Sequence, residues 1–178
     1  MKTDIPLKRL THLRPADLLL LPGTSAAEVL SVDTLQLPAS ATSLDTVLRL
    51  RQPDGTAYLH VIEWQGYYDI LFLWRVLGYL AWLGQNQPER PILVTLIYLK
   101  PDDDVGNTLI QHLAGQPGWI ITLPCIRLWQ EDAAAVLSSG RPGLAALSPL
   151  MHGATDNMVE QAASFLPQAK RRVDHTTA

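Results

Sequence analysis

Two acidic residues lie on either side of the clearest turn in the sequence. The tripeptide Pro53-Asp54-Gly55 separates two runs rich in β-branched, aromatic and leucine residues, 44–52 and 56–65. A turn tripeptide between two such runs predicts a β-hairpin with a three-residue loop. Centring this loop on its aspartate puts Asp45 of the first strand directly opposite Glu63 of the second.

Opposed carboxylates point to a metal site. Side chains directly opposite one another on an antiparallel pair share a face, with Cβ atoms about 4.5–5.5 Å apart, and like charges there repel. A divalent cation between Asp45 and Glu63 removes this repulsion, and carboxylate oxygens are ligands that Mg²⁺ and Mn²⁺ prefer. Such an ion activates water and offsets charge on a phosphoryl oxygen. The residues allow a second interpretation, in which both acids point into solvent from a hydrated face of the hairpin.

The other face of this hairpin is apolar. It carries Leu48, Leu50, Tyr58 and Ile62, which predicts that it packs into the core. His60 lies on this face, so we expect a hydrogen-bonded core histidine and not a metal ligand.

The segments around the hairpin predict an α/β protein. Thr24 or Ser25 can cap a short helix that contains Glu28. With the hairpin, a long apolar helix and a buried strand, the expected order is α-β-β-β-α-β, in which a crossover makes the last strand parallel. The further elements are expected as a strand over 29–37, a helix over 67–84, a strand over 92–99, a solvated polar loop over 102–104, a strand over 118–129, a helix over 131–139 and an amphipathic helix around 158–166.

Composition sets bounds on the class of protein. The chain has 178 residues, which fits one domain, and it is 47% apolar and 17% charged, which favours a sizeable core. Its net charge of −3 gives no overall signal of nucleic-acid binding. A lone cysteine, Cys125, excludes an intrachain disulfide and a cysteine-based zinc site. The longest apolar block, 70–83, is shorter than the roughly 20 residues of a bilayer span, so we expect a cytoplasmic protein.

These residues resemble a known family. The segments Leu44–Leu48 and His60–Gln65, the turn between them, Asp69 and the spacing Arg75-x-x-x-Tyr79 resemble the PD-(D/E)XK nuclease superfamily, and within it the Rpn/YhgA-like, transposase-associated branch. The resemblance covers about residues 24–100. It implies a restriction-endonuclease-like αβββαβ core with a mixed central sheet and C-terminal helical additions. We therefore expect a single domain, with its core over about 24–130 and an extension over about 131–178.

The resemblance also implies an activity, which is Mg²⁺- or Mn²⁺-dependent endonucleolytic cleavage of DNA linked to recombination or mobile elements. Asp45 and Glu63 would be metal ligands, and the backbone carbonyl of Trp64 would be a further one. Gln65 would orient the attacking water through hydrogen bonds.

Three more residues take supporting roles in this scheme. Arg75 and Tyr79 are four residues apart, so they share one face of the expected helix. An arginine amid so much apolar surface needs an anionic partner, which could be the acidic cluster, a phosphate or a structural ion pair with Asp69 or Glu89. Glu28 would match the acidic residue that many members carry on an N-terminal helix.

The sequence also departs from the pattern of the superfamily. Gln65 stands where most members have lysine, and Leu44 stands where the proline of the family name would precede Asp45. A second hypothesis is therefore a catalytically inactive descendant that uses the nuclease fold as a binding or oligomerisation module. A homodimer is compatible with the nuclease hypothesis, because cutting both strands of DNA commonly needs two sites.

Overall fold

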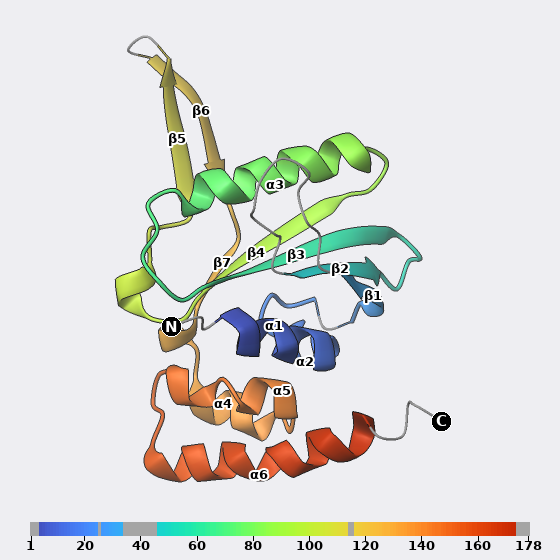
Figure 1. The fold of residues 1–178 in the computed structure, drawn as a ribbon, viewed down its shortest axis with the longest axis vertical. Helices are drawn as coiled ribbons and strands as arrows, with labels where there is room; N and C mark the ends of the chain where they lie inside the picture. The colour runs from blue at the N-terminus through green and yellow to red at the C-terminus, as the bar shows by residue number, and fades with distance from the viewer. Residues whose placement is uncertain (1–3, 25, 34–45, 114–115, 174–178) are drawn as a thin grey trace.

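A five-stranded mixed sheet forms the centre of the molecule (Figure 1). The computed structural model describes residues 4–24, 26–33, 46–113 and 116–173. The strands lie in the order β1-β2-β3-β4-β7, antiparallel from β1 to β3 and parallel from β3 to β7. Their bounds are Glu28–Asp33 for β1, Thr46–Arg51 for β2, Ala57–Gln65 for β3, Ile92–Tyr98 for β4 and Cys125–Arg127 for β7.

The β2–β3 hairpin has the predicted register. Its pairs run from Thr46 opposite Ile62 to Arg51 opposite Ala57, so the ladder is centred on the predicted turn. Gly55 there adopts a positive φ of 90°, a conformation that a side chain would strain. Asp45 lies outside the described residues, so its pairing with Glu63 stays a prediction.

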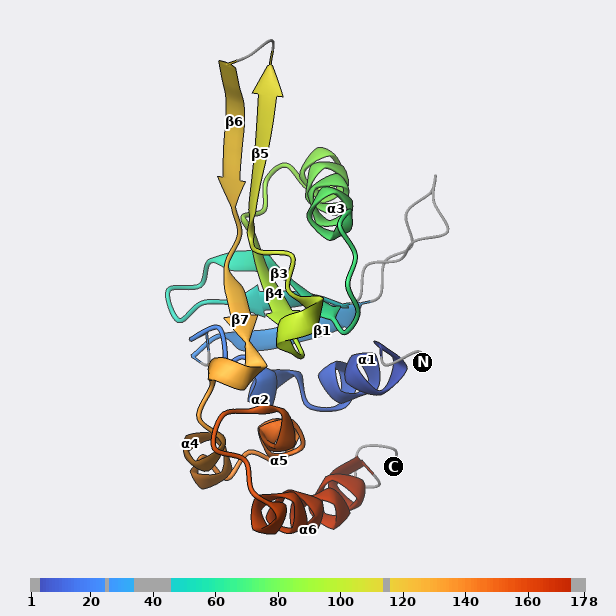
Figure 2. The same ribbon diagram turned by 90° about the vertical axis from the view of Figure 1, so that its left-hand side faces the viewer.

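Helices cover both faces of the sheet (Figures 1 and 2). Helix α3 connects β3 to the parallel β4 and packs on one face. The N-terminal and C-terminal helices lie on the other face, in the lower half of Figure 1. The helical bounds are Asp4–Leu13 for α1, Pro15–Leu18 for α2, Phe72–Asn86 for α3, Ala133–Ser138 for α4, Pro142–Ala145 for α5 and Asp156–Val173 for α6, with 3₁₀ turns η1 over Pro101–Asp103, η2 over Leu128–Gln130 and η3 over Ser148–Leu150.

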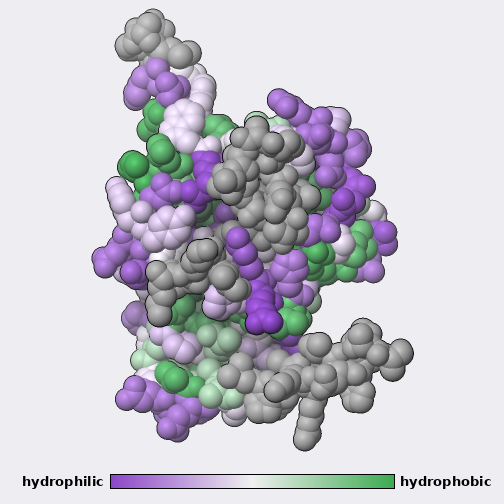
Figure 3. All heavy atoms as spheres, in the orientation of Figure 1, coloured by the Kyte–Doolittle hydropathy of each residue, from purple (hydrophilic) through white to green (hydrophobic). Residues whose placement is uncertain are grey.

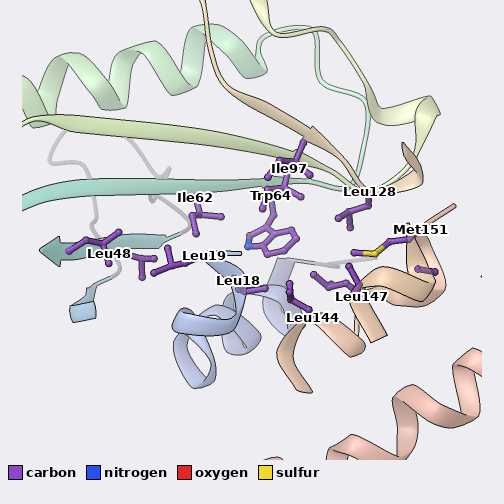
Figure 4. Packing of buried hydrophobic residues seen from close by; sticks show 14 of the residues in the cluster. Leu18, Leu19, Leu48, Ile62, Trp64, Ile97, Leu128, Leu144, Leu147 and Met151 are labelled. Carbon is purple, nitrogen blue, oxygen red and sulfur yellow. The ribbon is translucent and has the colours of Figure 1, made fainter. Parts of the chain in front are cut away.

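Each face of the sheet has its own apolar core. The core below the sheet joins Leu48, Ile62 and Trp64 to leucines of α2 and α5 (Figure 4). The Trp64 indole N–H donates to Thr11 Oγ1 of α1 at 3.1 Å, so α1 is held to the sheet by a buried hydrogen bond. The core above the sheet joins sheet residues to the inner face of α3, and its members include Val47, Leu59, Val61, Phe72, Leu73, Val76, Tyr79, Leu83, Val94, Leu96 and Tyr98.

The two ends of the described chain meet below the sheet. The Gly143 N–H of α5 donates to Asp17 Oδ2 of α2 at 3.0 Å, and this bond is buried. Asp17 also accepts from Arg14 Nε at 2.8 Å. A Cβ atom at Gly143 would lie 3.0 Å from the side chains of Arg14 and Asp17, so a side chain there would force these neighbours to move by a few tenths of an ångström.

A second, two-stranded sheet projects from the body (Figures 1 and 2). Strands β5, Thr108–Leu113, and β6, Gln116–Thr122, form an antiparallel hairpin between β4 and β7. We call this hairpin the arm. The single strand expected over 118–129 is therefore wrong: the chain leaves β6, passes Leu123 and Pro124, and re-enters the central sheet as β7.

The predicted order α-β-β-β-α-β is confirmed, but its first helix is misplaced. Helices α1 and α2 precede Gly23, and Glu28 begins strand β1. The central helix begins at Phe72 and not at Tyr67, and the loop before it exposes its side chains. The polar loop expected over 102–104 is also more buried than predicted, because Asp103 is 2% exposed and Asp104 pairs with Arg127 at 2.6 Å.

The C-terminal helices confirm the predicted additions. Asp132 caps α4 by accepting from the Ala134 N–H at 2.8 Å, and Gly140 follows the helix with a positive φ of 64°. Helix α5 was not anticipated. Within the described ranges, every helix is too short or too polar to cross a bilayer.

Candidate functional site

The end of β3 places two polar side chains in the upper core. Alternate residues of a strand point to opposite faces, so Val61, Glu63 and Gln65 share the face that α3 covers. Glu63 is 3% exposed and lies beside Leu96 of β4, while Gln65 is fully buried beside Tyr98. The interpretation that Glu63 points into solvent is therefore wrong, because the face that would be hydrated in an isolated hairpin is covered by α3.

Gln65 is fixed at one end of its amide only. Its Nε2 donates to the backbone carbonyl of Tyr67, which holds the amide plane in place. Its Oε1 is buried and accepts no hydrogen bond from the part of the chain that the structure describes. A buried acceptor without a partner is costly, and such atoms are usually satisfied by water or an ion. Gln65 thus presents a buried, oriented acceptor that no described residue satisfies.

Asp69 organises the loop between β3 and α3. Its Oδ1 accepts from the Leu71 N–H at 2.9 Å, and its Oδ2 accepts from Arg75. The Arg75 guanidinium also lies over the Phe72 ring, 5.3 Å from its centroid. Burial opposes the charged form of Arg75, but the hydrogen bond to Asp69 and the charge interactions with Tyr67, Asp69 and Tyr79 together outweigh it and raise the Arg75 pKa. Of the partners considered for Arg75, the structure shows the structural ion pair with Asp69.

Aromatic side chains line the sheet beside Gln65. Tyr98 donates its hydroxyl proton to the Gly106 carbonyl at 2.6 Å, and burial raises the pKa of this hydroxyl. The Phe72 ring meets Tyr98 edge to face, with centroids 5.7 Å apart. Tyr79 is 2% exposed in the same core. The helical spacing thus places Tyr79 against the sheet, as its sharing a face with Arg75 predicted.

The structure does not bring Glu28 to this site. Glu28 is exposed in β1, and it pairs with Arg51 at 3.3 Å near the turn of the hairpin, whereas Glu63 lies at the opposite end of β3. The prediction that Glu28 lies on an N-terminal helix and supports this site is therefore wrong. The misassignment came from reading Thr24 as a helix cap.

The predicted roles of the Asp45 side chain and the Trp64 carbonyl as metal ligands stay predictions. Asp45 lies outside the described residues. The Trp64 side chain points into the lower core, and a role for its carbonyl stays a prediction. Within the residues that are described, the structure has no group of three or more histidine, cysteine, aspartate or glutamate side chains that could hold a metal ion.

Sequence reasoning missed two features of this region. One is the bond from the Leu71 N–H to Asp69 Oδ1, although an aspartate shortly before a helix is a recognisable turn former. The other is exposure: Tyr67, Tyr68 and Ile70 are 55%, 62% and 68% exposed. Because these residues are apolar, the sequence pattern assigned them to the apolar helix expected over 67–84.

No protein-family model matches the chain, and no curated protein or solved structure matches it either. The structure shows an α/β protein with a five-stranded mixed sheet and C-terminal helices. Function is therefore inferred from the residues of this chain.

Proposed function

We propose that this protein is a metal-dependent endonuclease that hydrolyses phosphodiester bonds of DNA. The observation that carries the proposal is the open, buried Oε1 of Gln65, on the same strand face as the buried Glu63. The unsatisfied amide oxygen costs free energy in a purely structural core, and a carboxylate two residues away on the same face supplies the charge that a cation site needs. A site that takes a hydrated cation gives both groups a role.

The donor set fits a hard divalent cation. Glu63 and Asp45 would hold Mg²⁺ or Mn²⁺ through carboxylate oxygens, with the Trp64 carbonyl as a third oxygen ligand. The bound cation would supply positive charge that offsets charge on a phosphoryl oxygen and favours deprotonation of the attacking water. The confirmed register supports this set, because one further step of the β2–β3 ladder would pair Asp45 with Glu63.

Gln65 has a distinct task. Its amide cannot supply the positive charge of a lysine, but its Oε1 accepts a hydrogen bond from water. The bond from its Nε2 to Tyr67 fixes the direction in which Oε1 points. The Asp69–Arg75 pair in turn anchors the loop that carries Tyr67. These residues would orient the attacking water, and Arg75 and Tyr79 would act through position and not through contact with the reacting atoms.

The arrangement of elements supports the same class. The order αβββαβ, the antiparallel run from β1 to β3 and the parallel β4 reached through α3 are what a restriction-endonuclease-like core requires. The polar pair lies at the end of β3, next to the loop that leads into α3. A link to recombination or mobile elements follows from the resemblance alone.

The test measures Mn²⁺ binding by calorimetry and nicking of supercoiled plasmid on the same samples. Wild type and Glu28→Gln should bind and nick, because Glu28 is an acid of the same sheet that lies at the other end of the hairpin. Glu63→Gln and Asp45→Ala should lose both signals while circular dichroism shows the fold intact. Nicking that persists in Glu63→Gln, or a wild type that binds no Mn²⁺, contradicts the proposal.

A second candidate is an inactive nuclease-fold module that acts by binding. The commitment of Arg75 to Asp69 favours it, because this leaves the site without a free cation from α3. A scaffold of this kind would show neither Mn²⁺ binding nor nicking, and Glu63→Gln would then leave all its properties unchanged.

A further inference from the structure

The arm exposes an apolar pair on its outer face. Ile110 of β5 lies directly opposite Ile120 of β6, and these side chains are 49% and 61% exposed. The other face is anchored to the body: Leu109 and Ile121 pack against the upper core, and Trp119 meets Trp74 of α3 edge to face at 5.7 Å. The arm therefore has a fixed direction and an unpartnered outer face.

A second apolar surface lies beside the base of the arm. The loop that leads into α3 exposes Tyr67, Tyr68, Ile70 and Leu71, each more than half exposed. We call these four residues the shoulder. Trp74 links the shoulder to the arm, because it follows the loop on α3 and contacts Trp119. Figure 3 shows apolar residues, in green, along the arm and around its base.

The arm carries no formal charge. Residues 105–126 contain no aspartate, glutamate, lysine or arginine. A two-stranded ribbon is marginal in water by itself, and natural sequences usually guard such open strand edges with charges. A surface without lysine or arginine is also a poor match for phosphates, which argues against nucleic acid as its occupant.

We propose that a second copy of this chain covers these surfaces, with the arm of each protomer lying on the shoulder of its partner. An isologous interface needs a self-complementary surface in which residue i meets j and j meets i. The proposed dimer contains two such contacts, because the arm of each protomer meets the shoulder of the other. Neither the arm nor the four shoulder residues carry a charge that would repel the partner.

The exposed area fits a dimer. The six exposed residues, Ile110, Ile120 and the shoulder, present an accessible area on the order of 800 Å², backbone and tyrosine hydroxyls included, which is about what one partner buries in a standard interface. One arm alone would offer far less, so reciprocal contact is the arrangement that reaches this size. The partner's arm would then lie at the rim of the candidate site, because Tyr67 also holds Gln65 through its carbonyl.

Sedimentation equilibrium tests the proposal. Wild type should dimerise, and Ile120→Lys on the arm and Leu71→Glu on the shoulder should each raise the dimer Kd at least about tenfold, or ~1.4 kcal/mol. Val159→Lys on α6 is the matched control, since Val159 is 47% exposed at the far end of the molecule, and it should leave the Kd unchanged. Both sites are exposed, so circular dichroism should show native folds.

Mixing the two variants tests the reciprocity. In a mixture, Ile120→Lys and Leu71→Glu form a heterodimer with one intact arm–shoulder contact and one contact that joins lysine to glutamate. The mixture should therefore dimerise more tightly than either variant alone. A monomeric wild type, a dimer that only one of the two variants weakens, or a mixture that shows no rescue overturns the proposal. None of these outcomes depends on nuclease activity, which Glu63→Gln tests separately.

Discussion

The two faces of β3 use buried polar groups in different ways. The lower face carries Trp64, whose indole is satisfied by Thr11, and His60, whose Nε2 lies 2.9 Å from Thr95 Oγ1. These groups lie among leucines, and burial lowers the pKa of His60 to about 4, which keeps the ring neutral near pH 7. The upper face carries Glu63 and the open oxygen of Gln65 at the strand end. Both faces leave a buried polar atom without a hydrogen-bond partner, His60 Nδ1 below and Gln65 Oε1 above, and the upper face adds a buried carboxylate, Glu63, at the strand end.

Trp64→Ala should produce the largest effect and would sharpen this contrast. It removes the largest side chain of the lower face and leaves Thr11 Oγ1 without its donor. The free energy of unfolding should fall by about 3–5 kcal/mol in urea denaturation followed by circular dichroism. Trp74→Ala is the matched control, because Trp74 is 42% exposed, and it should cost about 1 kcal/mol. Equal losses of unfolding free energy in the two variants would show that the lower face contributes no more to stability than a half-exposed ring does.

Acid should destabilise the lower face through His60. The unfolded chain binds a proton at this ring with an ordinary pKa of 6.5, whereas the folded chain binds it only at about 4. Stability attributable to His60 is therefore complete above pH 6.5 and falls by up to about 3 kcal/mol as pH drops to 4. Chemical denaturation across this range should show a shallower slope for His60→Gln than for wild type.

Thr11→Val measures how firmly α1 is held to the sheet. The substitution keeps the shape but leaves the buried Trp64 N–H without an acceptor, so we expect a loss of about 1–2 kcal/mol. Thr108→Val on the exposed arm replaces another hydroxyl and should change the free energy of unfolding by less than about 0.5 kcal/mol. A silent Thr11→Val would mean that α1 docks through apolar contacts alone.

Gln65→Met should have the smallest effect on stability and completes the comparison. It removes the bond to Tyr67, worth about 1 kcal/mol, and also removes the unsatisfied Oε1, so the two changes offset. Thermal denaturation should show a free energy of unfolding within about 1 kcal/mol of wild type, while plasmid nicking is lost. A large loss of stability would assign Gln65 to the structure and not to the site.

Local patterns predicted the parts of the fold that local chemistry determines. The register of the β2–β3 hairpin followed from one turn tripeptide, and the buried strand followed from its unbroken apolar run. The arm escaped prediction because β6 runs on into β7 with only Leu123 and Pro124 between them, and because Gln111 and His112 interrupt the apolar character of β5. The first helix was misplaced because the Leu18–Leu21 run shows no helical period. Helices α1 and α2 are stabilised instead by tertiary contacts such as that of Thr11 with Trp64.

In the candidate site, too, local spacing predicts some features, and the folded structure decides the others. The shared face of Glu63 and Gln65 follows from the two-residue period of a strand. Their burial depends on α3, and the open oxygen of Gln65 depends on where the Tyr67 carbonyl lies, which no spacing reveals. The pairing of Arg75 with Asp69 was one of the partners considered, and only the folded loop selects it.

The buried bond from Gly143 to Asp17 has a consequence for synthesis of the chain. The two residues are 126 positions apart, so at 5–20 residues per second the ribosome makes Gly143 roughly 6–25 s after Asp17. During this interval the nascent chain can complete the hairpin, α3 and β4, while the leucines of α2 lack the helix that covers them. Helix α5, which is made later, therefore covers α2, which is made earlier, and an early stop before α5 would release a protein with its lower core open.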